Sequence, residues 1–105
     1  MAKKDPLLEE ISALLAAAEE ADDPARLERT LTNGYARALS LEIERTRLQK
    51  QIVTLTVAAA GDGGEVRRKL ASLQRQMNRQ EGDLGTLRAQ LRRLRHRHSS
   101  AVRAR

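Results

Sequence analysis

Few residues in this chain have types and spacing suited to chemistry. Its two histidines, His96 and His98, lie two positions apart in an arginine-rich stretch. A helix would direct their rings to different sides, and no Asp or Glu follows Asp83 to complete a metal site. The absence of cysteine excludes a thiol nucleophile and thiolate metal ligands. We therefore expect no metal site and no cofactor.

The acidic pairs and the hydroxyl groups offer no better catalytic arrangement. Glu9-Glu10 and Glu19-Glu20 fit a solvated helix surface, because no cleft is implied that would raise a carboxyl pKa. No plausible base accompanies any of the serines Ser12, Ser40, Ser72, Ser99 and Ser100. The sequence thus predicts a protein without catalytic residues, which is not an enzyme.

The glycine-rich stretch GDGG, residues 61–64, is the remaining candidate for a small-molecule site. A P-loop needs Lys followed by Ser or Thr after its glycines, and the sequence here continues EVRR. Asp62 is instead suited to cap a new helix, with Glu65 at the third helical position as in a capping box. We therefore expect a turn between two helices.

The composition indicates long helices rather than a globule. Hydrophobic residues make up 40% and charged residues 32% of the 105 residues, and Tyr35 is the sole aromatic residue. Asp-Pro pairs at residues 5–6 and 23–24 predict two helix starts. The expected segments are a short acidic amphipathic helix within residues 1–23, ending near Ala21, a hairpin of helices at about 24–59 and 64–98 with a turn at 60–63, and a basic tail at 99–105.

Both long helices carry an apolar repeat with alternating spacings of three and four residues, here called the seam. Its members are Leu27, Leu31, Gly34, Ala38, Leu41, Arg45, Leu48, Ile52, Leu55 and Ala59 in the first helix, and Val66, Leu70, Leu73, Met77, Gln80, Leu84, Leu87, Leu91, Leu94 and His98 in the second. Folding back places Leu48 opposite Met77 and small Gly34 opposite Leu91. The predicted fold is all-α: a long antiparallel helical hairpin, a coiled coil, preceded by a short amphipathic helix.

The same pairing sets Arg45 opposite Gln80, a polar layer within the seam. A polar seam residue costs stability, and its best-attested use is to fix register or partner number. Two other roles are open to Arg45. Its side chain could turn outward and pair with Glu42 or Glu81, or it could bind an anionic ligand. We favour the register role.

The first long helix carries a further apolar row, here called the outer stripe: Tyr35, Ala36, Leu39, Ile43, Thr46, Val53 and Val57. A two-helix hairpin cannot bury both the seam and this stripe. The short first helix is long enough to cover only its N-terminal part, so Val53 and Val57 would stay bare. The sequence therefore predicts a protein interface at Tyr35, Leu39, Ile43, Val53 and Val57, occupied by copies of the chain in a helical bundle or by a partner protein's helices.

Charge is distributed unevenly along the chain, whose net charge is +6. Residues 1–23 carry seven acids against two lysines, whereas residues 84–105 carry seven arginines and no acid. This asymmetry suggests a polyanionic partner, although the two ends could instead attract each other or the tail could simply be solvated. The candidate anion-binding residues are Arg68, Arg75, Arg79, Arg88, Arg92, Arg93, Arg95 and Arg97.

Part of the second long helix is similar to a motif of cyclic-dinucleotide-responsive anti-sigma factors of actinobacteria. Those helical hairpins carry a Glu-x3-Ser-x2-Arg-x3-Gln-x3-Asp repeat, which Ser72, Arg75 and Asp83 match. The chain departs from it with Arg68 in place of Glu and Arg79 in place of Gln. The resemblance covers about sixteen residues and implies a nucleotide-sensing regulator.

Two function classes follow. The first is a non-enzymatic coiled-coil interaction protein, such as an adaptor, assembly factor or regulator. The alternative is a regulator that binds nucleic acid or a nucleotide through the basic surface by salt-dependent contacts. No apolar run is long enough to span a membrane and no signal peptide is evident, so a cytoplasmic protein is expected. Arginine greatly outnumbers lysine, as in GC-rich bacterial genomes.

Overall fold

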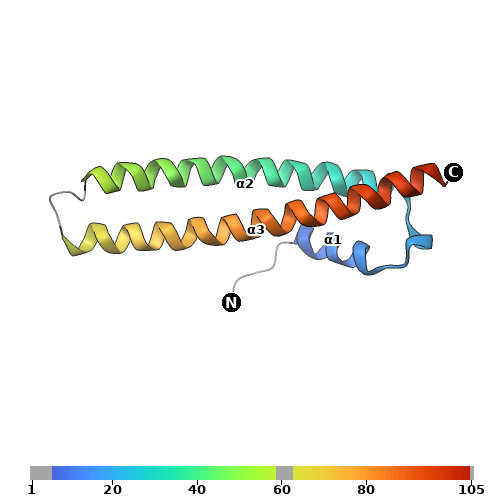
Figure 1. Cartoon of the computed structure of the whole chain (residues 1–105), viewed down its shortest axis with the longest axis horizontal. Coiled ribbons are helices and arrows are strands. Elements are labelled where there is room, and N and C mark those ends of the chain that lie inside the picture. The colour runs from blue at the N-terminus through green and yellow to red at the C-terminus, as the bar shows by residue number, and fades with distance from the viewer. Residues whose placement is uncertain (1–5, 59–62, 105) are drawn as a thin grey trace. The chain divides into compact units, whose positions relative to one another are not determined.

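The computed structural model describes residues 6–58 and 63–104, which form helices with no strand among them (Figure 1). Helix α1 spans Pro6–Ala16 and is followed by a 3-10 helix, η1, at Glu19–Ala21. Helices α2, Pro24–Ala58, and α3, Gly64–Arg103, lie side by side and run in opposite directions. The all-α helical hairpin predicted from the sequence is confirmed. The greater part of the predicted turn, with the Asp62 cap, lies outside the described residues.

Local hydrogen bonds explain where α2 begins and where α3 ends. The Asp23 carboxylate accepts a hydrogen bond from the Ala25 amide at 3.1 Å, so the predicted cap precedes Pro24. At the other end of the chain, α3 continues past the expected end at residue 98. The Ala104 amide donates to the Ser100 carbonyl at 3.1 Å, which keeps the helical pattern through residues assigned to the basic tail.

Helix α1 is shorter than the sequence indicated. It ends at Ala16 instead of near Ala21, because Ala18 adopts an extended conformation, with φ −63° and ψ 142°. The chain then resumes as the single turn η1. The alanine-rich sequence favours a longer helix, so a contact from elsewhere in the chain must stabilise this end.

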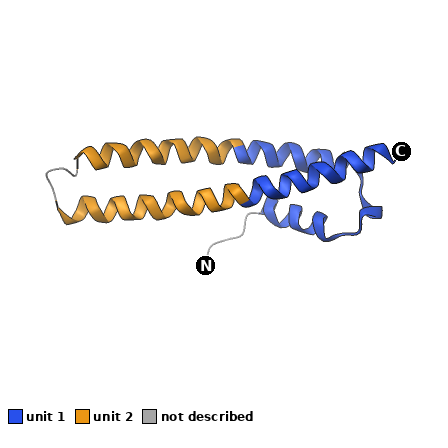
Figure 2. Ribbon diagram, viewed as in Figure 1, with its two compact units in different colours: residues 1–38, 86–105 blue, residues 39–85 orange. Residues whose placement is uncertain are grey.

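The chain divides into two compact units (Figure 2). Unit 1 comprises residues 1–38 and 86–105, and unit 2 comprises residues 39–85. Unit 1 therefore contains α1, η1, the first part of α2 and the last part of α3. Unit 2 contains only the remaining segments of α2 and α3.

Three helical segments enclose the core of unit 1. Ile11 and Leu14 of α1 are buried together with seam residues from both long helices: Leu27, Leu31, Ala38, Leu87, Leu91 and Leu94. A Cβ atom added at Gly34 would overlap the Leu91 side chain. The absence of a side chain at Gly34 therefore allows this close approach, and the predicted pairing of Gly34 with Leu91 is confirmed.

The core of unit 2 is shared by two helical segments. Leu41, Leu48 and Leu84 are buried, whereas the seam residues Ile52, Leu55, Val66, Leu70, Leu73 and Met77 are only partly buried. Two helices in contact shield a seam from one direction each and leave its two edges open to water. The same apolar repeat therefore gives shallower burial here than in unit 1.

Candidate functional site

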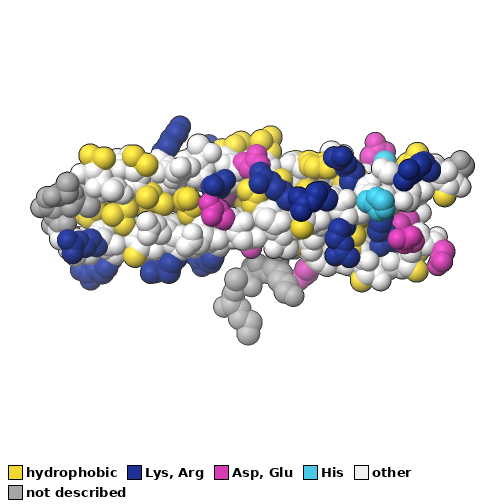
Figure 3. All heavy atoms as spheres, in the orientation of Figure 1, with side chains coloured by type: hydrophobic (Ala, Val, Ile, Leu, Met, Phe, Trp, Pro, Cys, Tyr) yellow, Lys and Arg dark blue, Asp and Glu magenta, His cyan; other side chains and the backbone are white. Residues whose placement is uncertain are grey.

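Several large apolar side chains of α2 lie on the surface. The exposed fractions are 45% for Tyr35 in unit 1 and, in unit 2, 58% for Leu39, 47% for Ile43, 58% for Val53 and 73% for Val57. Their spacing places them on one side of the helix, away from the seam. These are the residues that the sequence assigned to a protein interface, and Figure 3 shows hydrophobic side chains reaching the surface in this part of α2.

Helix α1 packs elsewhere and leaves Tyr35 exposed, so it does not cover the N-terminal part of the outer stripe, which its length would allow. Its polar side chains bind groups on other faces of the two long helices. Thr30 donates a hydrogen bond to Glu10 at 3.3 Å, and Gln90 donates one to Ser12 at 3.1 Å. Thr30 is only 2% exposed, so its hydroxyl needs such a partner.

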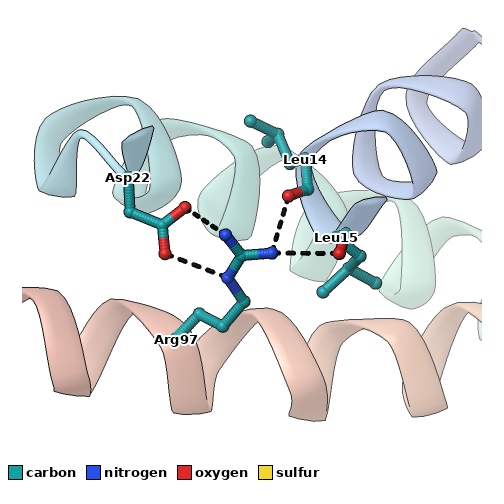
Figure 4. Close-up of polar contacts among 4 residues, drawn as sticks. All are labelled: Leu14, Leu15, Asp22 and Arg97. Atoms are coloured by element: carbon teal, nitrogen blue, oxygen red, sulfur yellow. Dashed lines mark hydrogen bonds and ion pairs between the residues drawn. The ribbon is translucent and has the colours of Figure 1, made fainter. Parts of the chain in front are cut away.

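The most buried polar contact of unit 1 centres on Arg97 (Figure 4). Its guanidinium forms a bidentate pair with Asp22, with Nε and Nη2 donating to the carboxylate oxygens at 2.9 and 2.5 Å. Its Nη1 donates to the carbonyls of Leu14 and Leu15 at 2.8 and 3.0 Å. These carbonyls belong to the last turn of α1 and have no partner within that helix. One side chain thus caps α1 and fastens the segment that follows it.

Arg97 was expected in the anion-binding set, and its placement corrects that expectation. The side chains of Arg97 and Asp22 are 9% and 7% exposed, so an external phosphate would have to displace an internal carboxylate. The sequence left open that the acidic and basic ends of the chain attract each other, and the ion pair between Asp22 and Arg97 is such a contact. The charge asymmetry was its signal in the sequence, but no spacing singles out Arg97 among its neighbouring arginines.

The remaining arginines of unit 1 lie closer to solvent. Arg92, Arg95 and Arg103 line a shallow groove of about 800 Å³ together with both histidines, Ser99 and Val102. A second groove, of about 620 Å³, lies between the end of α1 and α3 and includes Arg93. Figure 3 shows basic side chains gathered with a histidine over this part of α3. Arg88 lies on the same stretch of helix.

The other candidate anion-binding residues belong to unit 2. Arg75 and Arg79 are exposed on α3, and the Arg68 guanidinium donates to the Gly64 carbonyl of its own helix at 3.1 Å. The candidate set therefore divides between the two units. The two grooves described above both involve the group on the last part of α3.

The polar layer of the seam lies in unit 2. Arg45 and Gln80 do not bind each other there, and each instead binds a glutamate on the opposite helix. Arg45 pairs with Glu81, with Nε and Nη2 both 3.0 Å from the same carboxylate oxygen. Gln80 donates to Glu44 at 3.1 Å. Of the roles considered for Arg45, the structure shows the side chain turned outward and paired with Glu81. Each pair joins α2 to α3, which fits a role in holding the register.

The described residues contain no cluster suited to metal binding. No group of three or more His, Asp or Glu side chains between residues 6 and 58 or 63 and 104 could hold a metal ion. His96 is exposed and His98 is partly buried. Within the same ranges, no helix combines the length and the apolar character needed to cross a membrane.

Comparison of the chain with protein-family models, with curated proteins and with solved structures finds no match in any of the three. The resemblance to the anti-sigma motif therefore stands on its three matching residues. Ser72, Arg75 and Asp83 are all exposed on α3 in unit 2.

Proposed function

We propose that the protein is a non-enzymatic interaction protein that binds another helix through the outer stripe of α2. The observation that carries this proposal is the exposure of Leu39, Ile43, Val53 and Val57 on one face. Full burial of a side chain of this size stabilises a complex by roughly 1.5–3 kcal/mol, so half-exposed residues would each contribute about half of that. An apolar row of this kind is typical of a surface that is covered in the working assembly.

The geometry of unit 2 supports a helix as the occupant. The exposed apolar residues follow a single helix in two pairs, Leu39 with Ile43 and Val53 with Val57, and Thr46 and Lys50 occupy the positions between them, so the row has the periodicity of a second helix laid along the first. A small molecule would need a concave pocket, whereas this row lies along the outer side of a single helix. Adaptor, assembly and regulatory roles all use such a surface, and the proposal keeps the cytoplasmic location expected from the sequence.

The test is co-purification from the native host, followed by mass spectrometry. Ile43→Asp and Val53→Asp each place an unpaired charge in the proposed interface and should abolish partner capture. The matched control is Val102→Asp, since Val102 is an exposed apolar residue of similar exposure, 50%, on α3. Unchanged capture by both stripe variants would refute the proposal.

A second candidate function, polyanion binding, is favoured by the grooves on the last part of α3. Arg92, Arg93 and Arg95 lie there without an acidic residue in the same stretch of α3, and Glu19 is the one acidic residue that lines the second groove. Backbone phosphates would bind such a group with affinity that falls steeply as salt rises, because condensed counterions are released.

The test is titration with a DNA duplex and a cyclic dinucleotide over a range of salt concentrations. Replacing Arg92, Arg93 and Arg95 by Gln should weaken polyanion binding and flatten its salt dependence. Arg97 is left unchanged, because its replacement would disturb unit 1 rather than a binding site. Partner capture that survives in the arginine variant but not in Ile43→Asp would favour the first function.

A further inference from the structure

The exposed face of α2 is a heptad repeat with one charged member. From Leu39 onward, where α2 belongs to unit 2, Leu39, Thr46 and Val53 share one heptad position, here called the first position. Ile43, Lys50 and Val57 share the other, here called the second position. A single lysine in such a row lowers the stability of a coiled coil but fixes its register and partner number. Lys50 therefore restricts which helix fits against this face.

We propose that the occupant is a second copy of this chain, packed antiparallel through α2 in unit 2. This inference rests on the proposed function and names its partner. In an antiparallel pair the two heptad positions face each other. Centring the pair at the level of Leu48 then sets Leu39 against the second copy's Val57 and Ile43 against its Val53. Every large apolar residue exposed on this part of α2 finds an apolar counterpart.

The central layer of this arrangement brings Lys50 to the second copy's Thr46. The Thr46 hydroxyl donates to the Glu42 carbonyl at 3.0 Å, so its oxygen lone pairs remain able to accept a hydrogen bond. A lysine ammonium is a donor only, which suits this acceptor. Thr46 and Lys50, the two polar residues of this heptad row, are thus matched with each other, as the apolar residues are.

The alternative pairings of two copies are electrostatically or hydrophobically poorer. In a parallel pair each residue faces its own counterpart, which places Lys50 against Lys50 inside the interface. Sliding the antiparallel pair by one heptad sets Lys50 against Leu39 in one direction and against Val53 in the other. Each of these pairings buries an ammonium group without an acceptor, which is costly. The centred antiparallel register lowers this cost, because the Thr46 hydroxyl supplies an acceptor.

The charges beside the stripe give the dimer a distinctive salt dependence. Arg47 borders Lys50 on α2, so the two-fold axis gathers two arginines and two lysines. Their repulsion is screened as ionic strength rises. The dimer should therefore tighten with added salt, whereas polyanion binding weakens with it.

Sedimentation equilibrium across the micromolar range tests the existence of the dimer. We expect the wild-type chain to associate to dimers, and Ile43→Asp to weaken association by roughly a hundredfold or more, since the apolar contact with the second copy's Val53 is lost and a carboxylate is desolvated in its place. Ala71→Asp, at an exposed position of α3 in unit 2, should leave the constant unchanged, and circular dichroism should report equal helicity for all three proteins. A monomeric wild-type chain at the highest concentration would overturn the proposal.

Disulfide crosslinking tests the orientation, because the chain has no cysteine of its own. Leu39→Cys and Val57→Cys are made in chains of different tagged length and mixed before mild oxidation. The antiparallel register predicts that the mixed dimer forms fastest. Preferential crosslinking of Leu39→Cys chains with each other would show a parallel pair and overturn the proposed arrangement.

Failure of this inference and failure of the proposed function give different results. A monomeric wild-type chain whose partner capture is lost in Ile43→Asp would show that the outer stripe binds a different protein. A monomeric chain whose capture is unaffected by Ile43→Asp would remove both proposals together.

Discussion

Units 1 and 2 are built from the same seam, yet they close their cores differently. In unit 1 a third helix covers the seam, and Leu87, Leu91 and Leu94 are at most 2% exposed. In unit 2 the seam residues from Ile52 and Leu55 to Leu73 and Met77 remain partly exposed. An apolar repeat sets which residues face each other, but the number of helices around it sets how much area is buried.

The ion pairs of the two units also differ in burial, and the pair in unit 1 is again the more buried one. The Arg97–Asp22 pair of unit 1 is almost fully buried, whereas the side chains of Arg45 and Glu81 in unit 2 are 42% and 41% exposed. Water and salt screen the exposed pair, so it adds little stability. Unit 1 can thus be stable through its own contacts, and unit 2 gains most from a covering helix.

The largest expected effect comes from removing one partner of each pair. Arg97→Ala leaves Asp22 buried without its cation and uncaps α1, at a cost of about 3–5 kcal/mol. Arg45→Ala, the matched change in unit 2, should cost roughly 0.2–1 kcal/mol. Urea unfolding followed by circular dichroism measures both. Equal losses would contradict the difference between the two units.

Truncation of seam leucines should give the next largest difference. Leu94 is fully buried in unit 1, so Leu94→Ala should lower the free energy of unfolding by about 2–5 kcal/mol. Leu73 is partly exposed in unit 2, and Leu73→Ala should cost about half as much, because less area is lost and water can fill the space. The measurement is again urea unfolding, at a protein concentration low enough to exclude association. A larger loss for Leu73→Ala than for Leu94→Ala would contradict the shallower burial of the seam in unit 2.

Much of the hairpin could be predicted because its determinants are local or periodic. The Asp23-Pro24 start and the pairing of Gly34 with Leu91 follow from residue types and spacing alone. The position of α1 could not be predicted in this way. It depends on hydrogen bonds between residues far apart in sequence, such as Arg97 with Asp22 and Gln90 with Ser12.

The candidate interface was easier to predict than the candidate anion site. Helix α2 has two apolar faces, and in unit 2 only α3 lies against it. One face therefore stays exposed, and it carries Leu39, Ile43, Val53 and Val57. The arginines of α3 are alike in sequence, and only the fold separates buried Arg97 from Arg92 and Arg95, which line a groove.

The smallest expected effects come from two glycines, and they should have opposite signs. An added Cβ at Gly82 in unit 2 meets nothing within 4 Å, so Gly82→Ala should stabilise the protein by about 0.8–1 kcal/mol through helix propensity alone. At Gly34 in unit 1, the new methyl group would overlap Leu91, which is itself 2% exposed and has little room to move. Overpacking costs about 1–3 kcal/mol, which offsets or exceeds the gain in propensity. Thermal and urea unfolding of both variants should therefore show Gly82→Ala above and Gly34→Ala at or below the wild-type stability. A clear stabilisation by Gly34→Ala would mean that the helices of unit 1 are packed less tightly than the contact between Gly34 and Leu91 indicates.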